Sequence, residues 1–592
     1  MSAPRPLRGA LMVCGTTSDA GKSFVVAGLC RLLAREGVRV APFKAQNMAL
    51  NASVTADGGE IGHAQWVQAV AAGTEPEVAM NPVLLKPTGE RSSQVVVLGR
   101  PTGVQSAAEY HRSKRALLPV VLDALADLRR RFDVVICEGA GSPAEINLLD
   151  GDIVNLPLAR AAGLPAVVVG DIDRGGVFAS LYGTVAVLPD GLRSLVRGFI
   201  VNKLRGDPTL LGDACAELER RCGVPTLGVL PHVGVDDIDN EDSLALDRAM
   251  ADTAAGEGSW PAHPGPLGGA VLPAGPGGPG MYAEVDVLDV VALRWPRVSN
   301  AGDLDPLRLE PAVRVRWVRS VAELGRPDLV VLPGSKDTRG DLSWFRSTGL
   351  AAAVQSSDAA LVAVCAGLQM VGDRIDDPDG VEGPPGCDRG LGLLPVGTDF
   401  RGDKVLDRPA GEAVDGPVPA AGQPVRGYRI HHGRVTATGA ATPWLTRRAD
   451  DQAPGSSRDP ARGDPPTPGA RAHGRPADPP EVGEPDGPPG GSPASAGTDG
   501  RPGDRPAAEA GGEVLGWHAG RVVGTTLHGL FENDGLRAGV LRWAAERAGK
   551  RWSPSGLDFV AHRLARLDRM ADAVENHLDL DRLRALIAEG AP

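Results

Sequence analysis

Short apolar runs alternate with amphipathic stretches from residue 10 to about residue 235. Largely apolar runs separated by helical patterns are typical of a parallel sheet that is covered by helices on both faces. The predicted strands are Leu11–Cys14, Val38–Phe43, Val95–Leu98, Val134–Cys137, Ala166–Gly170 and Phe199–Asn202. The pattern predicts an N-terminal α/β domain, and in such domains phosphate-binding loops lie at the carboxyl ends of strands.

A second region of the same kind follows a stretch rich in Gly, Pro and Ala, which we interpret as an interdomain linker. Its predicted strands are Val313–Val318, Leu329–Leu332, Leu361–Val364, Leu391–Val396 and Val522–Leu527. The fold class is therefore α/β, with two α/β domains. The expected organisation is a domain over 8–248, a linker over 249–280, a domain over 281–536 and a helical tail over 537–592.

The second domain is interrupted over 449–512 by a tract rich in Pro, Gly, Asp and Arg. Between Asp451 and Ala510 the only large aliphatic residue is Val482, and there is no aromatic residue. Such a tract cannot bury enough apolar surface to offset the entropy of ordering, so we expect a disordered insertion in a surface loop. A tolerated spacer and an interaction segment are both compatible with this composition. After the insertion, helices are expected at Gly535–Ala548 and Asp568–Glu589.

Charge and cysteine usage narrow the class of protein. The formal net charge is −12, and acidic and basic residues are interspersed, which argues against a nucleic-acid or anionic-membrane partner. No apolar run reaches the roughly 20 residues that span a bilayer, and the start of the chain leaves no room for a signal peptide, so a cytoplasmic location is expected. The seven cysteines have no paired C-x-x-C spacing, which indicates reduced thiols without a disulfide framework or zinc site.

A phosphate-binding loop is predicted immediately after the first strand. The segment Gly15-Thr16-Thr17-Ser18-Asp19-Ala20-Gly21-Lys22-Ser23 is one residue longer than the pattern G-x-x-x-x-G-K-[ST]. Glycines let backbone N–H groups face phosphate oxygens, a lysine reaches the terminal phosphates, and a serine hydroxyl can bind Mg²⁺. The residues expected to contact ATP in this loop are Gly15, Thr16, Asp19, Gly21, Lys22 and Ser23. The alternative is a glycine-rich turn that caps the following helix.

Carboxylates follow two other strands of the N-terminal domain. Glu138 ends a strand that should lie beside the phosphate loop, where a carboxylate can hold Mg²⁺ together with Ser23. Asp171 and Asp173 follow the next strand, and either a role in binding metal or substrate or a helix cap would explain them.

The second domain contains a candidate nucleophile, Cys365. It ends an apolar strand and is followed by Ala-Gly and a helical pattern, as in a nucleophile elbow, where the positive end of a helix favours the thiolate. Backbone N–H groups at Gly334 and Ala366 are candidates for an oxyanion hole. His528 follows another strand and is the candidate general base. The alternative for Cys365 is a buried structural thiol.

Two resemblances follow from these motifs. The long loop and Glu138-Gly139-Ala140-Gly141 resemble the dethiobiotin synthetase-like group, in which ATP phosphorylates a carboxylate that a nitrogen then attacks. That resemblance implies that Lys44 lies near the phosphates and the substrate, although a solvated loop charge would also explain it. The cysteine and histidine segments resemble the class I glutamine amidotransferase domain, in which the two residues hydrolyse glutamine through a thioester.

Two departures from the class I pattern narrow the resemblance. Leu530 stands where a glutamate usually follows the histidine, a substitution typical of the cobyric acid and cobyrinic diamide synthase subgroup, and Glu532 could orient His528 instead. Ala363 and Ala366 stand around the elbow where the class I pattern favours glycine. Alanine can occupy such a turn at some cost in strain.

Taken whole, except for the linker and the insertion, the chain resembles the CobQ-type glutamine amidotransferases, the family of the cobyric acid synthases. Segments that carry the resemblance are Phe43 to Met48, Gly170 to Thr184, Glu241 to Leu244, Gly427 to Gly433 and His528 to Phe531. The resemblance implies a glutamine-hydrolysing ligase that uses ATP and Mg²⁺ to amidate carboxylates of a corrinoid, with an oligomeric state that the sequence leaves open. An amidase acting on cobyrinic acid or on a cell-wall glutamate, and a P-loop ATPase with an inactive amidotransferase domain, are the alternatives.

Overall fold

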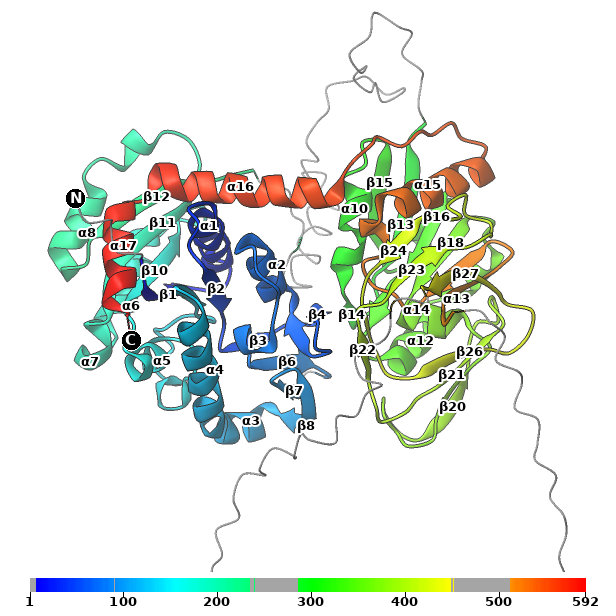
Figure 1. Ribbon diagram of the computed structural model, residues 1–592, viewed down its shortest axis with the longest axis horizontal. Coiled ribbons are helices and arrows are strands. Elements are labelled where there is room, and N and C mark those ends of the chain that lie inside the picture. The colour runs from blue at the N-terminus through cyan, green and yellow to red at the C-terminus, as the bar shows by residue number, and fades with distance from the viewer. Residues whose placement is uncertain are drawn as a thin grey trace, which may run out of the picture.

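The computed structural model describes residues 7–89, 91–234, 239, 286–448, 451 and 512–591. The expected linker over 249–280 and the segment Glu241 to Leu244 lie outside these residues, as does the expected insertion over 449–512 apart from two residues. Two α/β units lie side by side, and the chain ends on the N-terminal unit (Figure 1). No helix in the described ranges combines the length and the apolar character needed to cross a membrane.

The N-terminal unit is built around a six-stranded sheet of order β12-β11-β10-β1-β9-β2, in which every neighbouring pair is parallel. All seven residues of the central strand β1 are buried, as expected for a strand covered on both faces. The strands of this unit are β1 (Gly9–Gly15), β2 (Val40–Phe43), β3 (Gln46–Met48), β4 (Ala52–Val54), β5 (Glu60–Gly62), β6 (Val83–Pro87), β7 (Ser92–Val97), β8 (Arg100–Ser106), β9 (Val134–Glu138), β10 (Ala166–Asp171), β11 (Val196–Leu204) and β12 (Thr226–Pro231). Its helices are α1 (Lys22–Arg35), α2 (His63–Ala71), α3 (Ala107–Ser113), α4 (Leu118–Arg131), α5 (Leu156–Ala162), α6 (Val177–Ala186), α7 (Asp190–Arg193) and α8 (Ala214–Cys222).

The predicted strand Val95–Leu98 does not belong to the parallel sheet. It falls largely within β7, which pairs antiparallel with β6 and β8 in a separate four-stranded sheet. Leu98 and Gly99 both have positive φ, at 45° and 74°, and form a two-residue connection to β8. A connection that short can join antiparallel strands but not parallel ones, which need a crossover.

The C-terminal unit contains a nine-stranded sheet of order β15-β13-β16-β18-β29-β28-β27-β23-β24. Its first five strands are parallel and the others extend it in antiparallel fashion. The strands are β13 (Leu288–Leu293), β14 (Val298–Ser299), β15 (Val313–Val318), β16 (Leu329–Leu332), β17 (Gly334–Ser335), β18 (Ala360–Val364), β19 (Arg374–Asp377), β20 (Gly386–Arg389), β21 (Val396–Asp399), β22 (Val405–Asp407), β23 (Ala410–Ala413), β24 (Pro424–Arg426), β25 (Arg429–His431), β26 (Arg434–Ala437), β27 (Thr442–Arg447), β28 (Val514–Ala519) and β29 (Val522–Thr525). Its helices are α10 (Asp305–Arg308), α11 (Val321–Leu324), α12 (Thr338–Ser347), α13 (Leu350–Ser356), α14 (Ala366–Val371) and α15 (Asp534–Ala548), and the last two helices of the chain are α16 (Phe559–His577) and α17 (Leu580–Glu589).

The predicted strand Leu391–Val396 is wrong, because only its last residue lies in a strand. Leu391 donates its backbone N–H to Met370 O at 2.8 Å, and Leu393 donates to Val371 O at 2.9 Å. These bonds satisfy carbonyls at the end of α14, which a helix leaves without internal partners. The residues from Leu391 to Val396 are therefore apolar because they pack against the end of a helix, and not because they pair in a sheet.

The predicted helix Asp568–Glu589 is two helices. The chain is extended at Leu578, and the Asp579 side chain caps α17 by accepting from Arg582 N at 3.0 Å. Helix α16 leaves the C-terminal unit and packs on α1 (Figure 1). A methyl group at Gly28 would lie 2.8 Å from Val574 Cγ2, so a glycine in α1 permits this close approach. The end of the chain therefore completes the core of the N-terminal unit.

Candidate active sites

The phosphate loop joins β1 to α1 and is held open in a strained conformation. Asp19 and Gly21 have φ of 57° and 99°, the left-handed region that favours glycine. A methyl group at Gly21 would lie 1.9 Å from Asn202 Nδ2, which donates to Ala20 O at 3.0 Å. Lys22 Nζ donates to Thr17 O at 2.9 Å across the loop. The loop is therefore shaped before any phosphate binds.

Glu138 lies directly beside this loop, as expected from the strand order. Ser23 Oγ donates to Glu138 Oε1 at 2.9 Å, and Lys44 Nζ lies 3.0 Å from the same oxygen. Gln68 Nε2 donates to the other oxygen at 2.5 Å. Burial by itself would raise the pKa of Glu138, but Lys44 and the hydrogen bond from Gln68 lower it, so the carboxylate is ionised. The sequence did not predict a role for Gln68, on α2, because no motif in its own segment indicates a site.

Asp171 and Asp173 neither cap α6 nor meet Glu138. Asp171 Oδ2 accepts from Lys203 Nζ at 2.8 Å, and the same amine donates to Asp19 O at 2.7 Å. Asp173 pairs with Arg205 at 2.7 Å. The first aspartate thus anchors a lysine that holds the phosphate loop, and the second lies in an exposed ion pair.

Cys365 lies at a strained elbow between β18 and α14. Its φ and ψ are 54° and −110°, a rare combination for a residue with a side chain. The turn after it is tight, because a methyl group at Gly367 would lie 2.2 Å from Leu332 O. The thiol is buried, with the residue 5% exposed. Strain of this kind is typical of nucleophiles that a fold holds in one orientation.

His528 is oriented by Asp303 and not by Glu532. His528 Nδ1 lies 2.7 Å from Asp303 Oδ2, and the other oxygen of Asp303 accepts from Gly529 N at 2.9 Å. Glu532 instead pairs with Arg563 at 2.8 Å, so the alternative role considered for Glu532 is wrong. Burial would lower the pKa of His528, but the charges of Asp303 and then of Cys365, together with the hydrogen bond to Asp303, raise it to about 10. The imidazole is therefore protonated at neutral pH.

The sequence did not predict Asp303 as a site residue because the strand that precedes it was not predicted either. The run Leu288–Leu293 forms β13, next to the edge strand β15 of the sheet, and the chain after it leads to the short 3-10 turn Ala301–Leu304 that carries Asp303. Recognising that apolar run as a strand would have placed a polar turn at the carboxyl edge of the sheet, where candidate catalytic residues gather.

The two candidate oxyanion-hole residues border the cysteine and the histidine. A methyl group at Gly334 would lie 2.9 Å from His528 Cε1, so its backbone borders the imidazole. Ala366, the first residue of α14, is 1% exposed and directly follows the cysteine. The structure thus brings Cys365, His528, Gly334 and Ala366 together at one edge of the second sheet.

Hydrogen bonds at the junction tie this cysteine site to the N-terminal unit. The Tyr428 ring stacks on His528 with centroids 5.4 Å apart. Its hydroxyl accepts from Asn300 Nδ2 at 3.2 Å, and Asn300 Oδ1 accepts from Ala52 N at 3.1 Å. Ala52 lies in β4 of the N-terminal unit. Tyr428, which stacks on His528, is therefore linked to that unit through Asn300.

The same strand leads on to the phosphate site. Ser53 Oγ lies 2.9 Å from His63 Nδ1, at the first residue of α2. Gln68, which contacts Glu138, lies in the same helix. The two sites are therefore connected by contiguous contacts through β4 and α2.

A parallel sheet with a phosphate loop, joined to a sheet that carries a strained cysteine with its histidine and aspartate, defines a P-loop amidotransferase. The family models agree, because residues 11–243 match the CobQ/CobB/MinD/ParA nucleotide binding domain and residues 289–474 match the CobB/CobQ-like glutamine amidotransferase domain. The second match includes Cys365 and Asp303 and ends before His528.

Relatives cover almost the whole chain. Cobyric acid synthases of Nocardia farcinica and Frankia casuarinae are each 45% identical to it, over 99% of this chain and 98% of theirs. The cobyric acid synthase of Streptomyces coelicolor is 43% identical over 99% of this chain and 98% of its own. The chain belongs to the cobyric acid synthase family.

Replacing Asp303 by asparagine is expected to lower glutamine-dependent amidation by roughly 10³-fold or more, because removing the orienting carboxylate of a Ser-His-Asp triad costs about 10⁴. Initial rates of glutamate release would measure the loss. Glu532→Gln is the matched control, and it should have a much smaller effect because Glu532 pairs with Arg563. Equal losses in the two variants would contradict the role of Asp303.

Proposed function

We propose that this protein amidates the b, d, e and g side-chain carboxylates of adenosylcobyrinic a,c-diamide, using one glutamine and one ATP for each amide. The observation that supports this most strongly is the similarity to cobyric acid synthases over 99% of the chain. Two separate sites on one chain suit a reaction in which one site releases ammonia and the other activates its acceptor.

At the cysteine site, the Cys365 thiolate attacks the side-chain carboxamide carbon of glutamine. Gly334 and Ala366 would donate backbone N–H groups to the oxyanion that forms. The protonated His528 then gives its proton to the departing nitrogen, so that ammonia leaves and a thioester remains. Water, deprotonated by the now neutral imidazole, hydrolyses the thioester to glutamate, and the thiolate and the protonated imidazole are regenerated.

At the phosphate site, a substrate carboxylate attacks the γ-phosphorus of ATP and ADP leaves. The product is an acyl phosphate, which ammonia attacks with loss of phosphate, whereas a free carboxylate resists such attack. Lys22 and the loop N–H groups would bind the phosphates, and Lys44 would neutralise charge near the acceptor.

Ser23 and Glu138 fit a magnesium ion, because a hydroxyl and an ionised carboxylate already lie 2.9 Å apart and oxygen is the donor that Mg²⁺ prefers. Bound there, Mg²⁺ would neutralise charge on the β- and γ-phosphates. Gln68 would keep the other carboxylate oxygen in place.

Mass spectrometry of candidate substrates tests the proposal. The protein would be incubated with ATP, glutamine and either the a,c-diamide, cobyrinic acid or a cell-wall glutamate peptide. We expect four successive mass changes, each of one OH replaced by NH₂, on the a,c-diamide and none when ATP is omitted. Amidation of cobyrinic acid at a and c, or of the peptide alone, would refute the proposal.

A further inference from the structure

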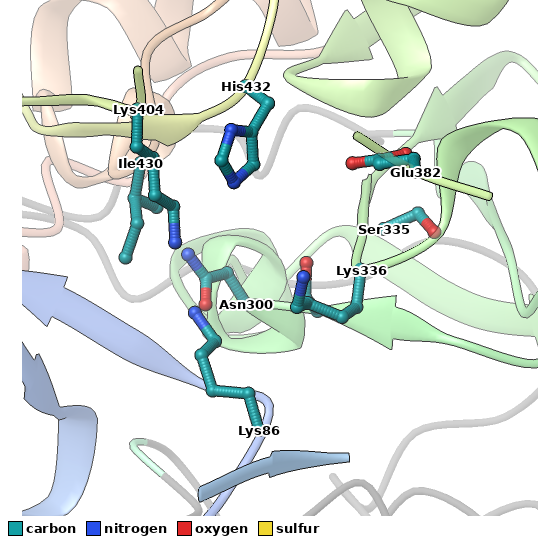
Figure 2. A pocket seen from close by; sticks show the side chains of 9 residues that line it. Lys86, Asn300, Ser335, Lys336, Glu382, Lys404, Ile430 and His432 are labelled. Carbon is teal, nitrogen blue, oxygen red and sulfur yellow. The ribbon is translucent and has the colours of Figure 1, made fainter. Parts of the chain in front are cut away.

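A cavity of about 30 Å³ lies at the junction of the two units (Figure 2). An ordered water needs roughly 10–15 Å³, so the cavity has room for a small polar group. Lys86 reaches it from β6 of the N-terminal unit, while Lys336, Lys404, Glu382 and His432 come from the C-terminal unit. Figure 2 shows Lys86 and Lys404 turned toward each other with Asn300 between them. We call this space the lysine cavity.

The acids around the lysine cavity are fewer than the bases. Both carboxylate oxygens of the fully buried Glu60 are taken, one by Lys404 and one by Lys86 at 3.1 Å. Among the residues that the structure describes, Lys336 has no carboxylate within 4.0 Å and so has no ion pair there. The remaining acid, Glu382, accepts a hydrogen bond from Thr338 N at 2.8 Å.

The electrostatics agree with an excess of positive charge. Burial, and after it the charge of Lys404, lowers the pKa of Lys336. Burial lowers the pKa of Lys86 to about 8, although Glu60 acts in the opposite direction. Burial raises the pKa of Glu382 to about 7, so this acid is only partly ionised at neutral pH. An anion in the cavity would relieve the repulsion among the ammonium groups.

The lysine cavity borders the cysteine site. Ser335, in its wall, follows Gly334, which lies against His528. Asn300, also in its wall, accepts a backbone hydrogen bond from Asp303 N at 3.0 Å. A ligand bound here would lie next to the segments that carry the imidazole and its aspartate.

We propose that the lysine cavity binds a carboxylate of a substrate, and that this is the α-carboxylate of glutamine. An amino acid is a zwitterion, and the cavity pairs its lysines with Glu382, which can accept a hydrogen bond from the α-ammonium group. A carboxylate of the corrinoid acceptor has the same chemistry but no ammonium group for Glu382. Because Lys86 belongs to the ATP-binding unit, that unit would complete the glutamine site. The inference rests on the proposed function only in taking glutamine as the nitrogen donor.

The test uses Lys336→Met, since this lysine has no ion pair with described residues. Glutamate release and amidation are measured with glutamine or with ammonium chloride as donor, and Lys336→Arg is the conservative variant. We expect the KM for glutamine to rise at least ~10-fold, with the KM for ammonia changing little and with Lys336→Arg close to wild type. Lys114 is half-buried and does not line the cavity, so it offers a control, Lys114→Met, that should leave all constants unchanged.

Each other outcome is decisive. If the KM for the corrinoid rises when ammonia is the nitrogen donor, the cavity binds a carboxylate of the corrinoid acceptor and not the α-carboxylate of glutamine. No change in either KM, for both Lys336→Met and Lys86→Met, would overturn the site altogether. Thermal shift with glutamine gives a second readout, because a bound ligand raises the melting temperature of the wild type and should not raise that of the variants. A shift in the glutamine KM without any corrinoid amidation by the wild type would refute the proposed function and leave this site standing.

Discussion

Replacing Cys365 by alanine should abolish glutamine-dependent amidation, by ~10³-fold or more, while amidation with ammonium chloride continues. The thiol is the candidate nucleophile at the edge of the second sheet, and loss of a nucleophile removes the covalent route entirely. Ammonia supplied from solution bypasses that step, since the phosphate site contributes none of its residues to the thioester. Rates of amide formation with each donor, measured by mass spectrometry, give the ratio directly.

Cys387→Ala is the control for this experiment, because Cys387 is an exposed free cysteine in β20. Cys387→Ala should leave the amidation rates with glutamine and with ammonium chloride unchanged. If Cys365→Ala retained glutamine use, the assignment of the nucleophile would be wrong. If it lost the ammonia-dependent reaction as well, the elbow would be needed for folding or for the junction between the units.

Lys22→Ala is expected to abolish amidation with either nitrogen donor. Its amine lies inside the phosphate loop, 2.9 Å from Thr17 O and 3.2 Å from Gly141 O, and the residue is 7% exposed. Removing one hydrogen-bond donor from a position where negative charge develops lowers kcat by roughly 10²–10³-fold. Loss of nucleotide binding would add to this effect. The measurements are the rate of ADP release and the affinity for ATP, each with saturating ammonium.

The comparison variant for Lys22 is Arg205→Ala, which removes an exposed ion pair with Asp173. It should change neither rate by more than a small factor. Glutamate release by Lys22→Ala shows whether the protein is still folded at its cysteine site. Near-normal ADP release by that variant would exclude the loop as the site of phosphate transfer.

The residues that sequence reasoning placed correctly beside one another share one property: each ends a strand or follows one, directly or after a single loop. Ser23 follows the loop after β1, Glu138 ends β9, and Cys365 follows β18. The carboxyl ends of parallel strands meet at one edge, so naming the strands is enough to bring such residues together.

The residues that were missed lie on elements that pattern alone does not connect to a site. Asp303 is 225 residues from His528, in a 3-10 turn, and Gln68 lies 70 residues from Glu138 on a short helix. Tyr428 reaches His528 through an isolated antiparallel bridge. Contacts of this kind depend on how segments that are distant in the sequence pack within each unit, and no local periodicity encodes that packing.

The return of the chain to its first unit has a consequence for biosynthesis. Leu567, Val574 and Ile587 share a buried cluster with α1 and β1, so part of the core beneath the phosphate loop is made last. During synthesis the N-terminal unit leaves the ribosome first, yet it cannot close its core until the amidotransferase unit and both final helices have followed. A polypeptide cut short before α16 would present α1 to solvent with that apolar face uncovered. The N-terminal unit therefore completes its core only after the last helices of the chain have been made.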